Sequence, residues 1–192
     1  MSLQLLSKII LIAIAISNIL TYMTIRNWLM KSKLGIIDSS ILSDLLWTFF
    51  ITIVSTCAVH MSYKKNLTTV LFLICSVLTY QSCYIFYRGF SLYFDPASFI
   101  GLYGSYWMDN PKHPIFGNIS REFKCCGFHK VDEFSDIKCR YPKAIPCLMA
   151  ISEALNKSIK DSGLVISAQA VLLLISAITI FVYFLIVTNS LK

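Results

Sequence analysis

Residues 121–130, with the sequence REFKCCGFHK, place two adjacent cysteines directly before a glycine. Two more cysteines, Cys139 and Cys147, complete a set of four within 23 residues. Cysteines at this density form disulfides or bind a metal ion. Consecutive Cα atoms lie about 3.8 Å apart, whereas a disulfide requires roughly 4.4–6.8 Å. Cys125 and Cys126 should therefore not bond to each other. Each is expected to pair with one of the two later cysteines, which leaves two possible connectivities. Gly127 can adopt a positive φ directly after the pair.

A zinc site is the alternative. Cys126 and His129 have the C-x2-H spacing of zinc ligands, and Cys139 and Cys147 could complete a set of four. The last two are separated by seven residues rather than two to four, however, and Cys125 would be left over. We therefore favour disulfides, and we expect no metal and no cofactor.

Four stretches without charged residues must position this segment. They contain 17, 19, 22 and 26 residues: Ile9–Ile25, Leu45–Tyr63, Asn66–Tyr87 and Gly163–Thr188. A helix of about 20 apolar residues crosses the hydrocarbon core of a bilayer, where its backbone must be paired internally. The chain is 56% hydrophobic and only 14% charged. The sequence predicts an all-α membrane protein with four transmembrane helices, the first completed by a snorkelling Lys8.

Two other interpretations of these stretches are weaker. The helices of a soluble bundle would show a polar face, and Gly163–Thr188 is apolar all round. A cleaved signal peptide would need a small-residue cleavage site, whereas residues 18–25 are bulky.

The spans divide the remaining chain into five segments. These are an N-terminal tail (1–8), a small loop (26–44), a turn (64–65), a large loop (88–162) and a C-terminal tail (189–192). Four spans put both termini on one side and both loops on the other. Lys and Arg barely distinguish the sides, with four in the tails and turn against three in the small loop.

The large loop carries the evidence for orientation. It holds the four clustered cysteines and two N-glycosylation sequons, which begin at Asn118 and Asn156. Both features are typical of an oxidising compartment. We therefore expect cytosolic termini and an extracellular or lumenal large loop, in a plasma or endosomal membrane.

The four spans, the large second loop and the REFKCCG segment resemble the tetraspanin family. The family pattern has two later loop cysteines, the second followed by a helix that leads into the fourth span; here these would be Cys139 and Cys147. The resemblance implies the pairs Cys125–Cys147 and Cys126–Cys139 in a mainly helical large loop. Claudins share the layout but carry their cysteine pair in the first loop, and residues 26–44 contain no cysteine.

Three amides lie within the predicted spans. Asn18, Gln81 and Gln169 are expected to face other helices and hydrogen-bond there, because unpaired amides are costly in lipid. Tetraspanins resemble this chain in carrying an Asn in span one and Glu or Gln in spans three and four, although Gln169 lies nearer the outer end. Cys57 is a candidate for palmitoylation, with a small buried cysteine as the alternative.

The large loop is expected to contain two packed helices. Residues 84–107 are rich in aromatic side chains, and Pro96, Gly101 and Gly104 predict that this aromatic helix is broken. A second helix is predicted by an apolar stripe with helical spacing, formed by Leu148, Ile151, Leu155 and Ile159.

No residue pattern in the loop indicates catalysis. No serine or free cysteine is spaced for activation by His113 or His129. The acidic residues Asp132, Glu133 and Asp136 are explained by a solvated loop. We expect no enzyme activity.

The net charge of +7 comes without a block of lysine or arginine, so no nucleic-acid partner is expected. The resemblance implies a membrane organiser that binds other integral membrane proteins, further copies of itself, and membrane lipids. The alternatives are a subunit of a channel or carrier, or a claudin-like adhesion protein.

Overall fold

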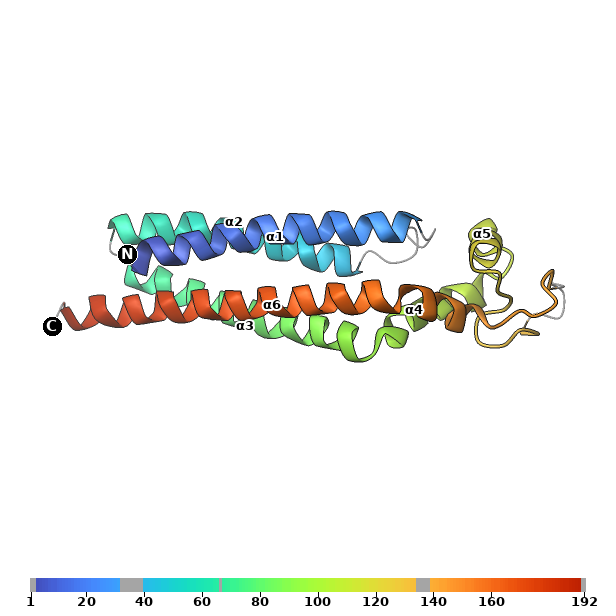
Figure 1. Ribbon diagram of the computed structural model, residues 1–192. Coiled ribbons are helices and arrows are strands. Elements are labelled where there is room, and N and C mark those ends of the chain that lie inside the picture. Colours follow the sequence, from blue (N-terminus) through green and yellow to red (C-terminus); the bar gives the residue numbers. More distant parts are fainter. Residues whose placement is uncertain (1–2, 32–39, 66, 134–138, 191–192) are drawn as a thin grey trace. The chain divides into compact units, whose positions relative to one another are not determined.

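The computed structural model describes residues 3–31, 40–65, 67–133 and 139–190. These residues form six helices and no strand: α1 (Leu3–Lys31), α2 (Ser40–Lys65), α3 (Thr68–Phe94), α4 (Pro96–Asp109), α5 (Pro114–Phe123) and α6 (Cys147–Ser190) (Figure 1). Four of them, α1, α2, α3 and α6, are long and apolar enough to cross a membrane. The predicted all-α fold with four candidate transmembrane helices is confirmed.

The helices run past the charge-free stretches that predicted them. α1 continues to Lys31, and α2 already begins at Ser40, so residues 26–31 and 40–44 of the predicted small loop are helical. Ile25 and Leu29, four residues apart, are both buried, so the apolar face of α1 persists beyond Arg26. A charged residue marks the edge of an apolar stretch but does not end a helix. Asn66, the first residue of the third predicted span, lies outside the described residues.

The chain divides into two compact units. The bundle unit comprises Met1–Met23, Leu42–Phe90 and Leu164–Lys192, and the loop unit comprises Thr24–Ile41 and Ser91–Gly163. The loop unit thus contains the end of α1 as well as most of the predicted large loop. Within it, Trp28 of α1 meets Phe99 of α4 edge to face, with ring centroids 6.5 Å apart.

All four long helices share the core of the bundle unit. Its buried residues come from each of them: Leu11, Ile14, Val59, Tyr63, Leu71, Ile74, Leu78, Leu173, Ala177 and Ile180. Between α3 and α6, the Cys75 thiol lies 3.4 Å from the carbonyl oxygen of Ala177, and the Ser82 hydroxyl donates to the carbonyl of Ala170 at 2.7 Å. The helices are therefore joined by polar contacts as well as by apolar packing.

Tyr63 shows which helix ends lie together in the bundle unit. Its hydroxyl is 3.3 Å from that of Ser7 in α1, and its ring centroid is 4.4 Å from that of Tyr183 in α6. The start of α1, the end of α2 and the end of α6 therefore meet, as Figure 1 also shows. This is the arrangement expected when four consecutive spans return both termini to the same side.

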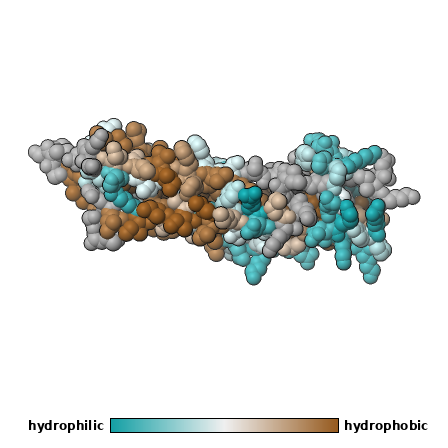
Figure 2. All heavy atoms as spheres, turned by 90° about the horizontal axis from the view of Figure 1, so that it is seen from above, coloured by the Kyte–Doolittle hydropathy of each residue, from teal (hydrophilic) through white to brown (hydrophobic). Residues whose placement is uncertain are grey.

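The outer surface of the bundle unit is apolar. Large hydrophobic side chains are exposed on all four helices, for example Ile16, Phe50, Leu73 and Ile178. In Figure 2 the brown, hydrophobic spheres gather over these helices. Water disfavours such a surface, whereas lipid tails match it, so the bundle unit is compatible with a multi-pass membrane protein.

The aromatic segment is broken at one point only. α3 ends at Phe94 and α4 begins at Pro96, because a residue before proline disfavours the helical conformation and proline suits the first turn of a helix. The prediction of a break at Pro96 is confirmed. The prediction for Gly101 and Gly104 is wrong, because α4 continues through both glycines to Asp109.

Candidate functional site

The CCG segment, residues 125–127, follows α5 in the loop unit and forms a tight turn, which is called the CCG turn below. Lys124 and Gly127 both have positive φ, of 49° and 60°. The backbone N–H of Cys125 donates to the carbonyl of Ser120 at 3.1 Å, and the Ser120 hydroxyl donates to the carbonyl of Cys125. The side chain and backbone of Ser120 thus hold the end of α5 against the first cysteine.

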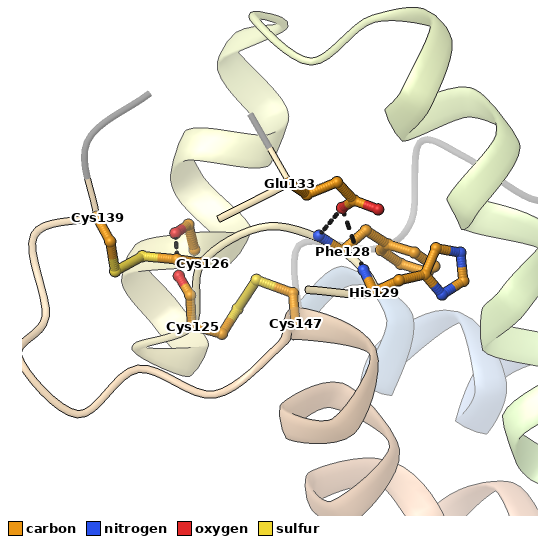
Figure 3. The surroundings of a disulfide bond; sticks show 8 residues. Cys125, Cys126, Phe128, His129, Glu133, Cys139 and Cys147 are labelled. Atoms are coloured by element: carbon orange, nitrogen blue, oxygen red, sulfur yellow. Dashed lines mark hydrogen bonds between the residues drawn. A yellow bond between two sulfur atoms is a disulfide. The ribbon is translucent and has the colours of Figure 1, made fainter. Parts of the chain in front are cut away.

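Two disulfides join this turn to later parts of the loop unit (Figure 3). The sulfur atoms of Cys125 and Cys147 lie 1.97 Å apart, and those of Cys126 and Cys139 lie 2.04 Å apart. This is the connectivity that the tetraspanin resemblance implies. The first bridge fixes the start of α6, and the second fixes the segment that begins at Cys139.

Backbone hydrogen bonds reinforce the first bridge. The N–H groups of Cys147 and Leu148, which have no partner within their own helix, donate to the carbonyls of Gly127 and Phe128 at 3.1 and 3.0 Å. The N–H of Cys126 donates to the carbonyl of Ile145 at 3.2 Å. The CCG turn therefore caps α6.

Glu133 closes the turn that follows the glycine. Its Oε2 accepts hydrogen bonds from the backbone N–H groups of Phe128 and His129, at 2.5 and 3.1 Å (Figure 3). The sequence interpretation of Glu133 as a member of a solvated acidic cluster missed this role. A carboxylate a few residues after a glycine that bends the chain is the signal that could have revealed it. Asp136 lies outside the described residues.

Phe128 is the apolar anchor of the turn. Its side chain is fully buried, and its ring centroid lies 5.4 Å from that of Trp107 in α4. A Cβ atom added to Gly104 would lie 2.6 Å from the Phe128 ring. Gly104 therefore serves close packing, and glycine is required there because any side chain would collide with Phe128.

The residues of the zinc alternative do not assemble into a ligand set. Cys126, Cys139 and Cys147 are each part of a disulfide, and the His129 ring packs edge to face against Phe128 at 4.8 Å. Among the residues that the structure describes, no group of three or more His, Cys, Asp or Glu side chains could hold a metal ion.

The predicted modification sites are accessible. Asn118 on α5 and Asn156 on α6 are both exposed, on helices rather than in irregular loops. The amide oxygen of Asn118 accepts a hydrogen bond of 2.8 Å from Arg121. Cys57 is an exposed free thiol on α2.

The three amides of the predicted spans lie buried in the bundle unit but differ in their contacts. Gln81 of α3 donates to the hydroxyl of Thr48 in α2 at 2.8 Å. Gln169 of α6 donates to the hydroxyls of Ser17 and Thr21 in α1, at 2.7 and 2.9 Å. Both amides therefore join neighbouring helices.

Asn18 behaves differently and supports a prediction. It is 1% exposed, and neither of its amide atoms has a hydrogen-bond partner among the described residues. An unsatisfied buried amide costs about 1–3 kcal/mol. We expect Asn18→Leu, which keeps the branching at Cγ, to raise the thermal midpoint of the detergent-solubilised protein. The matched change Gln81→Leu, which removes the interhelical hydrogen bond to the Thr48 hydroxyl, should lower the midpoint. A loss of stability in Asn18→Leu would show that the amide has a partner.

A second polar contact in the bundle unit joins α2 to α3. The carboxylate of Asp44 accepts from Arg88 Nε and from the Tyr84 hydroxyl, each at 2.9 Å. The ion pair is partly exposed, so we expect Asp44→Asn to cost only about 1 kcal/mol. A double-mutant cycle with Arg88→Gln, followed by thermal unfolding, measures the coupling. Additive effects of the two changes would show that the contact contributes nothing.

Comparison with protein-family models, with curated protein sequences and with solved structures finds no match to this chain.

Proposed function

We propose that this chain is a tetraspanin-like membrane organiser. In this proposal the bundle unit spans the membrane with both termini in the cytosol, and residues 88–162 face an extracellular or lumenal space. The bundle unit binds other integral membrane proteins laterally, and the disulfide-linked loop unit recognises them.

The observation that carries the proposal is the double anchoring of the CCG turn. One bridge leads to α6, the other leads to Cys139, and the buried Phe128 ring packs against Trp107 of α4. The two disulfides join cysteines 22 and 13 positions apart in the sequence. In the chain-entropy model, a disulfide that closes a loop of this length stabilises the fold by about 3 kcal/mol. A surface held in one conformation loses less entropy when a partner binds.

The bundle unit supplies the lateral contacts in this proposal. Its exposed apolar residues on all four helices can pack equally well against lipid or against apolar helices of another membrane protein. Its buried polar side chains among the described residues, such as Gln81 and Gln169, are all uncharged. A channel or carrier would need ionisable groups along its path, so the organiser is favoured.

Co-purification tests the proposal. Cys125→Ser combined with Cys126→Ser removes both bridges, and we expect it to release the membrane proteins that co-purify with the native chain in mild detergent. The matched control is Cys57→Ser with Cys83→Ser, which removes two exposed free thiols and should keep these partners. An unchanged set of partners after loss of the bridges would contradict the proposal, and selective ion flux through the purified protein in proteoliposomes would favour a channel instead.

A further inference from the structure

The loop unit contains a pocket of about 620 Å³. It is formed by the end of α4, the segment 111–113, α5, the CCG turn, Val131 and the two residues after Cys139. A volume of this order accommodates a ligand the size of a few side chains. All of its lining residues belong to the loop unit.

The rim of the pocket is positively charged. Lys112, Arg121 and Arg140 line it, and all three side chains are exposed. Among the described residues no Asp or Glu lines the pocket, and none forms a salt bridge with these three cations. Three cations around one concave site attract an anion and disfavour a basic or neutral partner.

The wall of the pocket is aromatic. Trp107 is 4% exposed and stacks on Phe116 with ring centroids 4.2 Å apart, so it forms a rigid surface. Tyr141 is half-buried on the same pocket. Trp, Tyr and Arg are the residues most enriched among those that dominate the binding energy of protein interfaces.

The second disulfide assembles the two sides of the pocket. Cys126 lines it directly, and its bridge to Cys139 fixes the chain that carries Arg140 and Tyr141. The other side of the pocket carries Arg121 on α5. Its guanidinium donates hydrogen bonds to the carbonyl of Gly117 and to the amide oxygen of Asn118, one turn earlier on the same helix. The Arg121 side chain and the backbone that carries Arg140 are therefore positioned before a ligand arrives.

We propose that this pocket binds an acidic peptide segment of a partner protein. Carboxylates of the segment pair with the three cations, and one aromatic or aliphatic side chain enters the pocket against Trp107 and Tyr141. A sulfated glycan would use the cations but leave the aromatic wall without a contact, so the peptide is favoured. The inference rests on the proposed function and specifies the chemistry of the partner.

The test is a binding titration with the full chain in detergent after enzymatic removal of N-glycans. The probe is a fluorescein-labelled, glutamate-rich peptide with one central tryptophan, and its binding is followed by fluorescence anisotropy. We expect saturable binding that weakens as salt is added, and at least about tenfold weaker binding when glutamine replaces every glutamate. Equal binding of the glutamine peptide would overturn the proposal, as would binding of a heparin oligosaccharide without binding of the acidic peptide.

Matched variants assign the binding to the pocket. Arg121→Glu with Arg140→Glu should weaken the acidic peptide by more than about tenfold, whereas Lys157→Glu, an exposed position on α6 that does not line the pocket, should change binding by less than about twofold. Arg121→Gln with Arg140→Gln provides the same test if charge reversal prevents folding. Native affinity in these variants would contradict the inference.

The two sets of variants distinguish failure of the proposed function from failure of the acidic-peptide inference. If the charge variants keep the co-purifying partners while the cysteine variants lose them, the organiser function stands and the acidic-peptide inference is wrong. If neither set of variants loses the partners, the proposed function itself is contradicted.

Discussion

Replacement of Gly127 by alanine is expected to unfold the CCG turn. Gly127 has a φ of 60°, and an added Cβ would lie 1.8 Å from the carbonyl oxygen of Lys130. A left-handed conformation costs about 1–2 kcal/mol for a residue with a Cβ, and relief of the collision adds a cost of about 1–3 kcal/mol. The collision involves backbone, so no side-chain rotation can relieve it. We expect Gly127→Ala to lower the free energy of unfolding of the loop unit by about 3 kcal/mol or more.

The matched control is Gly101→Ala in α4. A Cβ added at Gly101 meets nothing within 4 Å, and alanine favours a helix over glycine by about 0.5–1 kcal/mol. The control should therefore match or exceed the stability of the native chain. Thermal unfolding followed by tryptophan fluorescence measures both variants, because Trp107 lies in the loop unit. Equal midpoints for the two variants would show that the backbone at Gly127 is not constrained.

Truncation of Phe128 should have an effect of similar size for a different reason. The ring is fully buried between α4 and the turn, and Gly104 leaves space shaped to it. Phe128→Ala would leave a cavity, and such changes cost about 3–5 kcal/mol. For a unit of this size the thermal midpoint should fall by more than about 10 °C.

The control for Phe128 is Met149→Ala, since Met149 on α6 is 59% exposed. Its truncation removes a side chain of comparable size from the surface, and the midpoint should stay close to that of the native chain. Limited proteolysis provides a second measure, because loss of the Phe128 anchor should expose the chain after Gly127 to cleavage. Native resistance to protease in Phe128→Ala would contradict the assignment of Phe128 as the anchor.

The four long helices could be predicted from the charge-free stretches of the sequence alone. Long charge-free stretches are a consequence of lipid solvation, so they indicate spans without any knowledge of tertiary packing. Helix ends were predicted less well. The continuation of α1 past Arg26 depends on the burial of Leu29, and burial depends on neighbours that are distant in sequence.

The candidate site was predicted only in part for the same reason. The spacing of Cys125 and Cys126 excluded one connectivity, but the choice between the other two came from a family resemblance and not from geometry. The fit of Phe128 against Gly104 joins residues 24 positions apart, and no local pattern reveals it. The capping of α6 by Gly127 and Phe128 is likewise a tertiary contact.

The most direct test of the central claim is the redox state of the four loop cysteines in intact cells. Cells are treated with a membrane-permeant alkylating reagent, and the purified chain is digested without reduction and analysed by mass spectrometry. We predict that peptides containing Cys125 and Cys126 remain linked to those containing Cys139 and Cys147. Alkylation of all four loop cysteines would show that they are thiols facing a reducing compartment, and this result would contradict the account.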